Sequence, residues 1–371
     1  MKNIFIPNRK EYLMQLTHSV GTFVNNCRWR AEFYLRPKPN KIKENYDFKS
    51  LKNCSPKAEM KEFEDKLYDM TKNIKFKEVP NNFQKKLNSE IKKINNDDKV
   101  YIPADKTTNF YRMKPEEAEA LIEKEINKEY RKAEANIVEE LNEEAKGIAH
   151  KLEIEDRVFA TTKIDAFQSL KDHKPNFKNK PTSRLINPTK PELGRVSKKL
   201  LRKIVNIVRK KSGLMQWNNT NDLLIWFNGL AEKERLHFIS YDINSFYPSI
   251  TEELLRKAIE HASKYTPISD DEKEVLFHTC KSLLYYKGEA WRKKGTSLFD
   301  ITMGGFPGAE KCDLVGLYLL SRIKHLKMEA GVFRDDGLAV SKLSKKENEN
   351  LKKEICKIFK EEGLDITIKV N

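Results

Sequence analysis

The sequence has no long apolar run, few cysteines and no excess of acidic residues. No run approaches the roughly 18 apolar residues that a spanning helix needs, and the opening stretch MKNIFIPNRKEY lacks an apolar core of secretory length. The five cysteines are widely spaced and contain no CxxC pair, which argues against a disulfide framework and a zinc site: Cys27, Cys54, Cys280, Cys312 and Cys356. We therefore expect an intracellular protein of the nucleus or cytoplasm, neither secreted nor membrane-bound.

Positive charge is what the sequence has in excess. Its 71 Lys and Arg outnumber 55 Asp and Glu, giving a formal net charge of +16 over 371 residues. This balance favours a polyanionic partner, with nucleic acid first and an anionic membrane surface second. A Lys-rich solvated surface that only reflects genome composition is the alternative. With 39% hydrophobic residues, the chain is long enough for two or three domains.

Three regions follow from the patterns along the chain. Residues 1–99 are predicted to be a basic helical region with a linker around 36–57, which is rich in Pro, Asn, Lys and Ser. Residues 100–235 begin with strand-like sequence and continue in one long Glu/Lys helix over 115–153. Strands and loops follow over 158–190, and then a basic amphipathic helix at 195–211.

The third region, 236–371, has the clearest pattern. LHFISYDI predicts a strand ending at Asp242, and Ser249 with Glu252 predicts a capping box that opens the next helix. Few strand signals occur over 277–302. The glycine-rich loop GGFPG at 304–308 precedes a helix that is expected to stop near Gly331.

A hairpin carrying Asp335 and Asp336 comes next. A second capping box at Ser344 and Glu347 then opens a helix to Glu362, and alternation in LDITIKV predicts a last strand. The order indicates an α+β fold, an antiparallel sheet backed by helices.

Three carboxylates converge if the strands of Asp242 and of Asp335–Asp336 are neighbours. Their repulsion in a partly dry site costs several kcal/mol, by rough Coulomb arithmetic, unless a cation offsets it. Mg²⁺ takes hard oxygen ligands from carboxylates and substrate phosphates, and two such ions can activate a 3′-hydroxyl and stabilise a leaving pyrophosphate. Taken alone, however, Asp336–Gly337 is also a favoured hairpin turn, and Asp242 can cap the turn that follows its strand.

The motifs in this order resemble those of reverse transcriptases. YDINSFYPSI at 241–250 looks like motif A, and FRDDGLAV at 333–340 looks like motif C. PADK at 103–106, LKDHKPN at 170–176 and SRLINP at 183–188 are similar to Penelope-like reverse transcriptases of retroelement origin. The resemblance covers about residues 100–371. It implies right-hand polymerase fingers over 100–235 and a palm over 236–371.

The resemblance implies roles at the acidic cluster. Asp242 and Asp335 would ligate two Mg²⁺ ions, with Mn²⁺ as an alternative, and Asp336 would be a more dispensable catalytic carboxylate. The main-chain carbonyl of Ile243 would help to hold the nucleotide's metal. Tyr247 would lie under the sugar and exclude a 2′-hydroxyl, and its alternative role is that of a core aromatic. Phe246 would be the packed neighbour of Tyr247 in this nucleotide-binding segment.

Cations are expected around the triphosphate and the polymer. Arg184 falls where the family places a fingers arginine, and a guanidinium suits bidentate phosphate contacts. Lys171, Lys174 and Lys106 are further candidates, with a solvated loop that meets only template phosphates as the alternative. Six side chains of the basic helix are expected to follow the nucleic-acid backbone: Lys198, Lys199, Arg202, Lys203, Arg209 and Lys210.

The glycine loop would be motif B, in which Gly305 and Gly308 let the backbone approach the template base and the incoming nucleotide. It departs from the family pattern, because no Gln precedes the first glycine and no Ser-Pro follows the second. The chain also stops at Asn371 without a recognisable thumb. We therefore expect either a fragment or a thumbless gene product.

The leading hypothesis is an RNA-directed DNA polymerase whose partners are an RNA template, a DNA primer or RNA–DNA hybrid, and dNTPs. No protein partner is indicated. A family-B-like DNA-directed DNA polymerase shares a similar motif A, but its Asp-x-Asp motif is absent here. The third hypothesis is a catalytically inactive, domesticated palm that binds RNA.

Overall fold

The computed structural model describes six stretches of the chain: residues 9–35, 60–75, 82–155, 163–191, 193–295 and 297–370. They belong to two compact units, which divide between Val100 and Tyr101. The predicted linker at 36–57 lies outside these stretches. No helix within them is both long and apolar enough to cross a membrane. Their four cysteines form no disulfide: Cys27, Cys280, Cys312 and Cys356.

The described part of the first unit is helical, as predicted. It contains α1 (Arg9–Leu35), α2 (Lys61–Lys72) and α3 (Asn82–Asn95). Helices α1 and α2 pack together through an ion pair between Arg28 and Glu64 and a contact between Phe23 and Phe63, whose ring centroids are 6.3 Å apart.

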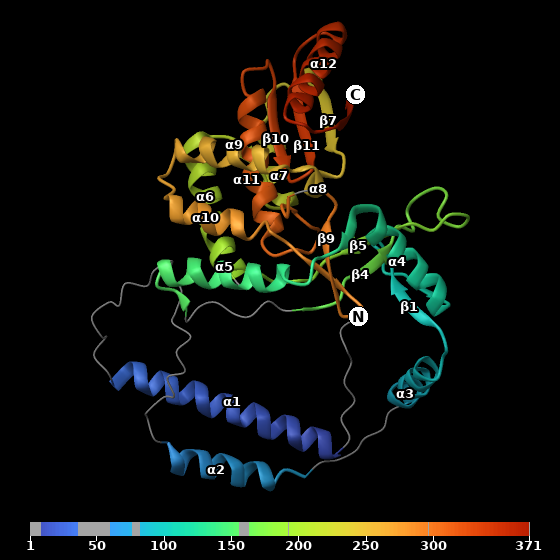
Figure 1. Cartoon of the computed structure of the whole chain (residues 1–371), viewed down its shortest axis with the longest axis vertical. Coiled ribbons are helices and arrows are strands. Elements are labelled where there is room, and N and C mark those ends of the chain that lie inside the picture. Colours follow the sequence, from blue (N-terminus) through green and yellow to red (C-terminus); the bar gives the residue numbers. More distant parts are fainter. Residues whose placement is uncertain are drawn as a thin grey trace. The chain divides into compact units, whose positions relative to one another are not determined.

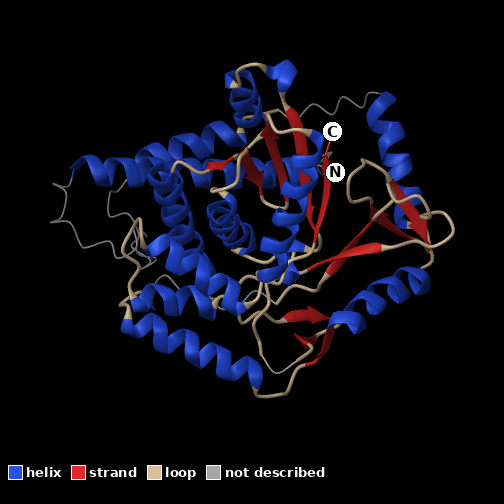
Figure 2. Cartoon of the chain, turned by 90° about the horizontal axis from the view of Figure 1, so that it is seen from above, coloured by secondary structure: helices blue, strands red, loops and turns tan. Residues whose placement is uncertain are grey.

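The second unit begins with small sheets and helices that carry the predicted fingers region. In chain order these are β1 (Val100–Pro103), β2 (Phe110–Met113), α4 (Pro115–Glu129), β3 (Tyr130–Lys132), α5 (Ile137–Lys151), β4 (Phe167–Leu170), β5 (Ser183–Ile186), α6 (Gly194–Ser212), β6 (Met215–Gln216), α7 (Thr220–Gly229) and a 3₁₀ turn (Lys233–Arg235). Strand β1 pairs with β2 and β4 with β5, and both pairs lie outside the central sheet (Figure 2).

The remaining elements contribute four strands of the central sheet, the helices around it, and two strands that form a separate sheet with β3. They are β7 (His237–Ile243), α8 (Phe246–Ser249), α9 (Glu252–Ser263), α10 (Asp270–His278), β8 (Leu284–Tyr286), β9 (Glu289–Lys293), α11 (Gly308–Ile323), β10 (Glu329–Phe333), β11 (Asp336–Ser341), α12 (Lys345–Glu361) and β12 (Ile366–Val370). The α+β prediction is confirmed by this mixture of helices and a largely antiparallel sheet.

The central sheet has the strand order β12-β7-β11-β10-β6. Its pairs are antiparallel except β10 with β6, which are parallel. Alternate residues of β7, Ile239, Tyr241 and Ile243, belong to the main core with apolar residues of α6, α9, α11 and α12. Figure 1 shows α9 and α11 beside the strands of this sheet. A smaller cluster around Trp217 and Trp226 contains Val340 of β11. Helices α6, α9, α11 and α12 therefore back one face of the sheet, whereas α7 packs against the other.

The single long helix predicted over 115–153 is wrong. Helix α4 begins at Pro115, as its first-turn preference indicates, but the chain leaves the helix at Tyr130 and forms β3 against β9. The Tyr130 hydroxyl donates to Asp300 Oδ2 at 2.8 Å in a buried contact. Tertiary pairing therefore overrides the helix propensity of the Glu- and Lys-rich sequence.

Three further boundaries differ from the sequence prediction. The 277–302 segment contains the hairpin β8–β9, whose turn uses Lys287 and Gly288, both at positive φ. Helix α11 ends at Ile323 rather than near Gly331, since a turn follows at 324–328 and β10 begins at Glu329. Helix α9 is capped by Thr251, whose side chain accepts from the amide of Leu254, and not by Ser249. The capping box at Ser344 and Glu347 forms as predicted.

Gly337 has a close-packing requirement that can be tested. A Cβ there would lie 2.0 Å from Cζ of the Tyr241 ring, which packs edge-on against Phe359 of α12. Gly337→Ala is therefore expected to lower the free energy of unfolding by about 1–3 kcal/mol. Gly147→Ala is the control, since nothing lies within 4 Å of its Cβ position in α5, and it should be stabilising by up to about 1 kcal/mol. Equal effects of the two substitutions in denaturant unfolding would contradict this packing.

Candidate active site

Asp242 and Asp336 face each other across two central strands. Strands β7 and β11 pair antiparallel, and their register places Asp336 directly opposite Asp242. The carbonyl of Asp335 accepts a hydrogen bond from the amide of Ile243 at 2.9 Å. The prediction that these strands are neighbours is confirmed, and all three aspartates lie at one end of this pair.

The hairpin turn consists of Arg334 and Asp335. Phe333 pairs with Asp336 in the β10–β11 register, so the two residues between them form the loop, with Arg334 at a φ of 56°. The alternative in which Asp336 and Gly337 form the turn is therefore wrong. Gly337 is required instead by the Tyr241 ring on the helix-covered face.

The charges of the cluster act on Asp336. Burial, followed by the charges of Asp335 and Asp242, raises the pKa of the Asp336 carboxyl. Lys106 acts in the opposite direction, so the turn after β1 brings its cation within electrostatic range of the cluster. The repulsion predicted from the sequence is thus present, and one lysine partly offsets it.

The carboxylates of this cluster are the kind of ligand that Mg²⁺ prefers, but they do not surround an ion by themselves. Carboxylate oxygens are the hard ligands that this ion takes, usually with waters and substrate phosphates completing its shell. Within the described residues, no three His, Cys, Asp or Glu side chains are gathered closely enough to hold a metal by themselves. The three aspartates therefore fit an ion whose remaining ligands come from a substrate. The Ile243 side chain is buried, so only its main chain is available there.

Tyr247 and Phe246 occupy different environments on α8. Tyr247 is half-buried, and its Cε1 lies 3.5 Å from the position of a Cβ on Gly308. Burial, then nearby Cys312, raises the pKa of its hydroxyl, on which the charge of Asp335 also acts. Tyr247 thus lies between the glycine loop and the acidic cluster. Phe246 lies in the main core, so direct nucleotide contact does not fit its position, whereas the packed role does.

The glycines of the 304–308 loop are explained by contacts within the protein. A Cβ on Gly305 would lie 2.4 Å from Thr302 Oγ1, and one on Gly308 would lie 3.1 Å from the Thr302 carbonyl oxygen. Gly304 has a φ of 84° and lies against Ile186 and Asn187. Packing within the protein is therefore enough to explain why these positions are glycine. A close approach by a template is not needed to explain them, so the loop gives no independent support for motif B.

Asp105 lies near three of the predicted phosphate-binding cations. It bonds to Arg184, its charge acts on Lys171, and Lys106 follows it in the sequence. Arg184 Nη1 donates to Asp105 Oδ1 at 2.9 Å. Burial lowers the pKa of Lys171, and the charges of Arg184 and Asp105 act on it in opposite directions. The structure therefore brings these three predicted phosphate-binding cations to one side of the unit, with Lys174 exposed beside Lys171.

Of the predicted side chains of α6, Lys198, Arg202 and Arg209 have contacts within the protein that limit their reach to a polyanion. Lys198 Nζ and Arg202 Nε lie 3.4 and 2.9 Å from Glu310 Oε1. Arg209 donates to Asn218 and Gln216. Lys199, Lys203 and Lys210 are exposed, as is most of Arg202. We therefore retain the predicted contact with a polyanion only for the exposed side chains of α6: Lys199, Arg202, Lys203 and Lys210.

Sequence reasoning missed four acidic residues near these elements. Asp105 holds Arg184, Asp172 accepts from three side chains of the 107–111 segment, and Glu310 pairs with α6. Asp313 Oδ1 lies 4.0 Å from Arg334 Nε. Their partners are 21 to 112 residues away in sequence, so no local pattern could have identified these contacts.

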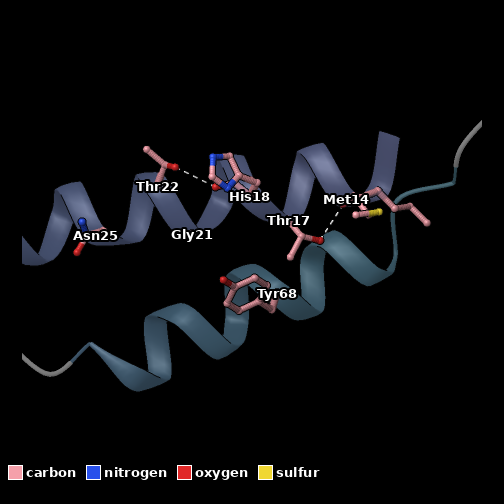
Figure 3. Close-up of a pocket in the computed structure, with 8 residues that line it drawn as sticks. Met14, Thr17, His18, Gly21, Thr22, Asn25 and Tyr68 are labelled. Atoms are coloured by element: carbon pink, nitrogen blue, oxygen red, sulfur yellow. Dashed lines mark hydrogen bonds between the residues drawn. The ribbon is translucent and has the colours of Figure 1, made fainter. Parts of the chain in front are cut away.

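A groove in the first unit is unrelated to this chemistry. It has a volume of about 840 Å³ and lies between α1 and α2 (Figure 3). Thr17 and Thr22 donate to carbonyls of their own helix, Leu13 and His18. The lining contains no carboxylate, lysine or arginine, and His18 is its one ionisable side chain besides Tyr68.

Comparisons with known proteins bear on the fold only. No protein-family model matches the sequence, and no curated protein matches it. Among solved structures, apo telomerase from Candida tropicalis is 11% identical, with a TM-score of 0.53 over 83% of this chain and 61% of that one.

Two further structures fall below a TM-score of 0.5. A C-terminally truncated apo telomerase from C. tropicalis gives 0.49 at 12% identity, covering 73% of this chain and 59% of its own. Telomerase from Candida albicans, in complex with a TWJ fragment of telomeric RNA, gives 0.47 at 11% identity, covering 74% and 48%. The chain thus spans less than two thirds of the length of the telomerases it matches. The likeness to the apo enzyme shows that the fold of this chain is similar to that of telomerase.

Proposed function

We propose that this chain is an RNA-directed DNA polymerase that adds dNTPs to a primer 3′-hydroxyl. One observation carries the proposal: Asp336 lies opposite Asp242, with Asp335 in the adjoining turn, at one end of the central strand pair. The fold likeness to telomerase, a reverse transcriptase, is consistent with this function but does not establish it.

Asp242 and Asp335 would hold two Mg²⁺ ions, and Asp336 would act as the more dispensable carboxylate. When bound, these ions supply charge neutralisation and activation of the 3′-hydroxyl for attack on the α-phosphate. The protein needs no nucleophile of its own, since its residues position the reactants and shape the local charge. The backbone of Ile243 runs beside Asp242 and can offer its carbonyl to the nucleotide's metal.

The incoming nucleotide would lie between Tyr247 and the cations of the 105–184 region. Tyr247 would exclude a 2′-hydroxyl by steric clash, and Arg184, Lys171 and Lys106 would face the triphosphate. The exposed lysines of α6 would contact the backbone of the template or the duplex. A Penelope-like origin is part of the proposal. It is supported by two contacts of Asp105 in PADK, which joins SRLINP through Arg184 and LKDHKPN through the Leu170 carbonyl.

A second candidate is a palm that binds RNA without catalysis. Its support is the lack, among the described side chains, of three acidic groups gathered tightly enough to hold a metal unaided. A DNA-directed, family-B-like polymerase has less support, because its two motif C aspartates are separated by one residue whereas Asp335 and Asp336 are adjacent.

Primer extension on paired templates of one sequence tests the proposal. The purified chain with Mg²⁺, dNTPs and a DNA primer is expected to extend the primer on RNA. Extension on the DNA template should be equal or weaker. Extension on DNA alone would favour the family-B alternative, and binding of the RNA duplex without extension on either template would favour the non-catalytic palm.

A further inference from the structure

The turn that follows β1 is fixed against β4 by main-chain contacts. The amide of Asp105 donates to the Leu170 carbonyl at 2.8 Å, and the amide of Ala104 donates to the Asn109 carbonyl at 2.9 Å. Ala104 and Leu170 also form a β-bridge. Asp105 therefore occupies a defined place beside the β4–β5 pair, in whose register Arg184 lies opposite Ser169.

The Asp105 carboxylate is a buried anion with one hydrogen-bonded cation. Its side chain is 8% exposed, whereas that of Arg184 is 34% exposed. Oδ1 accepts from Arg184 Nη1, and Oδ2 is buried without a hydrogen-bond partner. Separating this pair would leave an uncompensated charge in a poorly hydrated place, which is strongly unfavourable. Asp105 thus restricts the guanidinium to a narrow range of positions.

Asp172 holds the same turn from the other side. Its Oδ2 accepts from Thr107 Oγ1 at 2.6 Å, Asn109 Nδ2 at 3.1 Å and the Tyr111 hydroxyl at 3.1 Å. Lys171 immediately precedes it and lies within electrostatic range of Arg184 and Asp105. One rigid turn therefore links both cations, while its next residue, Lys106, acts on Asp336.

We propose that Asp105 is a positioning residue that pre-orients Arg184 for the polyphosphate group of a nucleoside triphosphate. The inference rests on the proposed function and adds a residue to it. A guanidinium anchored through one Nη keeps its other N–H donors for phosphate oxygens. Because its rotamers are restricted before the ligand arrives, less side-chain entropy is lost on binding.

The opposite role makes the opposite prediction. If Asp105 only competed with phosphate for Arg184, removing its charge would free the guanidinium and tighten anion binding. If Asp105 positions Arg184, the same substitution releases the guanidinium into many rotamers and weakens binding. The direction of the change separates the two roles.

The test is calorimetric titration of the full chain with inorganic tripolyphosphate in metal-free buffer, which requires no polymerase activity. Asp105→Asn is expected to weaken binding about 3- to 10-fold, the scale of immobilising one flexible side chain. Arg184→Gln should weaken it at least as much, and the double variant no further, because the two residues act as one unit. Asp270→Asn, which removes an exposed carboxylate paired with Lys273, should leave the affinity unchanged.

Unchanged or tighter binding by Asp105→Asn, or no binding by the folded wild-type chain, overturns the inference. Should Asp105→Asn fail to fold, Asp105→Glu keeps the charge but displaces the guanidinium, so the same loss is expected and its absence overturns the inference. In primer extension, Asp105→Asn should raise KM for dNTP more than it lowers kcat. A chain that binds tripolyphosphate as described but extends no primer would refute the polymerase proposal alone.

Discussion

Asp335→Ala is expected to reduce primer extension by at least about 10²-fold, the scale of losing one preorganised electrostatic contact in the transition state. Asp242→Ala should lose at least as much, because Asp242 lies on the central strand opposite the hairpin. Asp336→Asn should lose less, about 10- to 100-fold, as for a group that supports metal ligands rather than being the principal one. Steady-state extension rates with saturating primer–template measure all three.

Asp365→Asn is the matched control for these substitutions. Asp365 is exposed beside the same sheet, and its contact with Asn244 uses the main-chain carbonyl, which the substitution preserves. Its extension rate should equal that of the wild type. A loss in Asp365→Asn as large as that in Asp335→Ala would mean that any change of charge at this edge is harmful, and the specific role of the three aspartates would be refuted.

Tyr247→Ala is expected to reduce discrimination between dNTP and rNTP by about 10²-fold, the upper range for an added or missing group in a shaped pocket. The ring lies against Gly308 and next to Cys312, between the glycine loop and Asp335. Its removal leaves room where the ribose 2′-hydroxyl would clash. The ratio of kcat/KM for the two nucleotides is the measurement.

Tyr247→Phe distinguishes the contribution of the ring from that of the hydroxyl. It retains the bulk but loses the polar contact with Cys312, so discrimination should remain close to that of the wild type. If Tyr247→Ala folds and extends primers with unchanged discrimination, Tyr247 is a core aromatic and not a sugar-excluding residue. That outcome would leave the metal-site proposal untouched.

The sequence predicted the relative positions of the three aspartates better than it predicted the segments around them. Asp242 follows an alternating strand and Asp335–Asp336 interrupt a hairpin, and such local patterns determine where side chains lie once the strands pair. The turn at Arg334 and Asp335 lies one residue before the predicted tip at Asp335 and Asp336, and two before the alternative Asp-Gly turn, since the Tyr241 ring requires Gly337 within the strand.

Predictions failed where distant partners decide the local structure. Tyr130 leaves a helix-forming sequence because β9 and Asp300 stabilise it as a strand. The sequence predicts Lys198 and Arg202 on a solvent-facing basic side of the helix. In the fold both pair with Glu310, which is more than 100 residues away in sequence. Asp105 lies in the PADK motif, but the motif does not identify its partner, because Arg184 is 79 positions later. Hydrophobic periodicity predicts on which face of a helix or strand a residue lies. It does not predict which distant residue contacts that face.

The most direct test of the central claim is single-nucleotide addition by the purified chain on a DNA primer annealed to RNA, with Mg²⁺, compared with Asp335→Ala. The account predicts that the wild-type chain adds only the dNTP complementary to the template base and that the folded variant adds none at the same enzyme concentration. No addition by the folded wild-type chain, or addition that Asp335→Ala leaves unchanged, would contradict it.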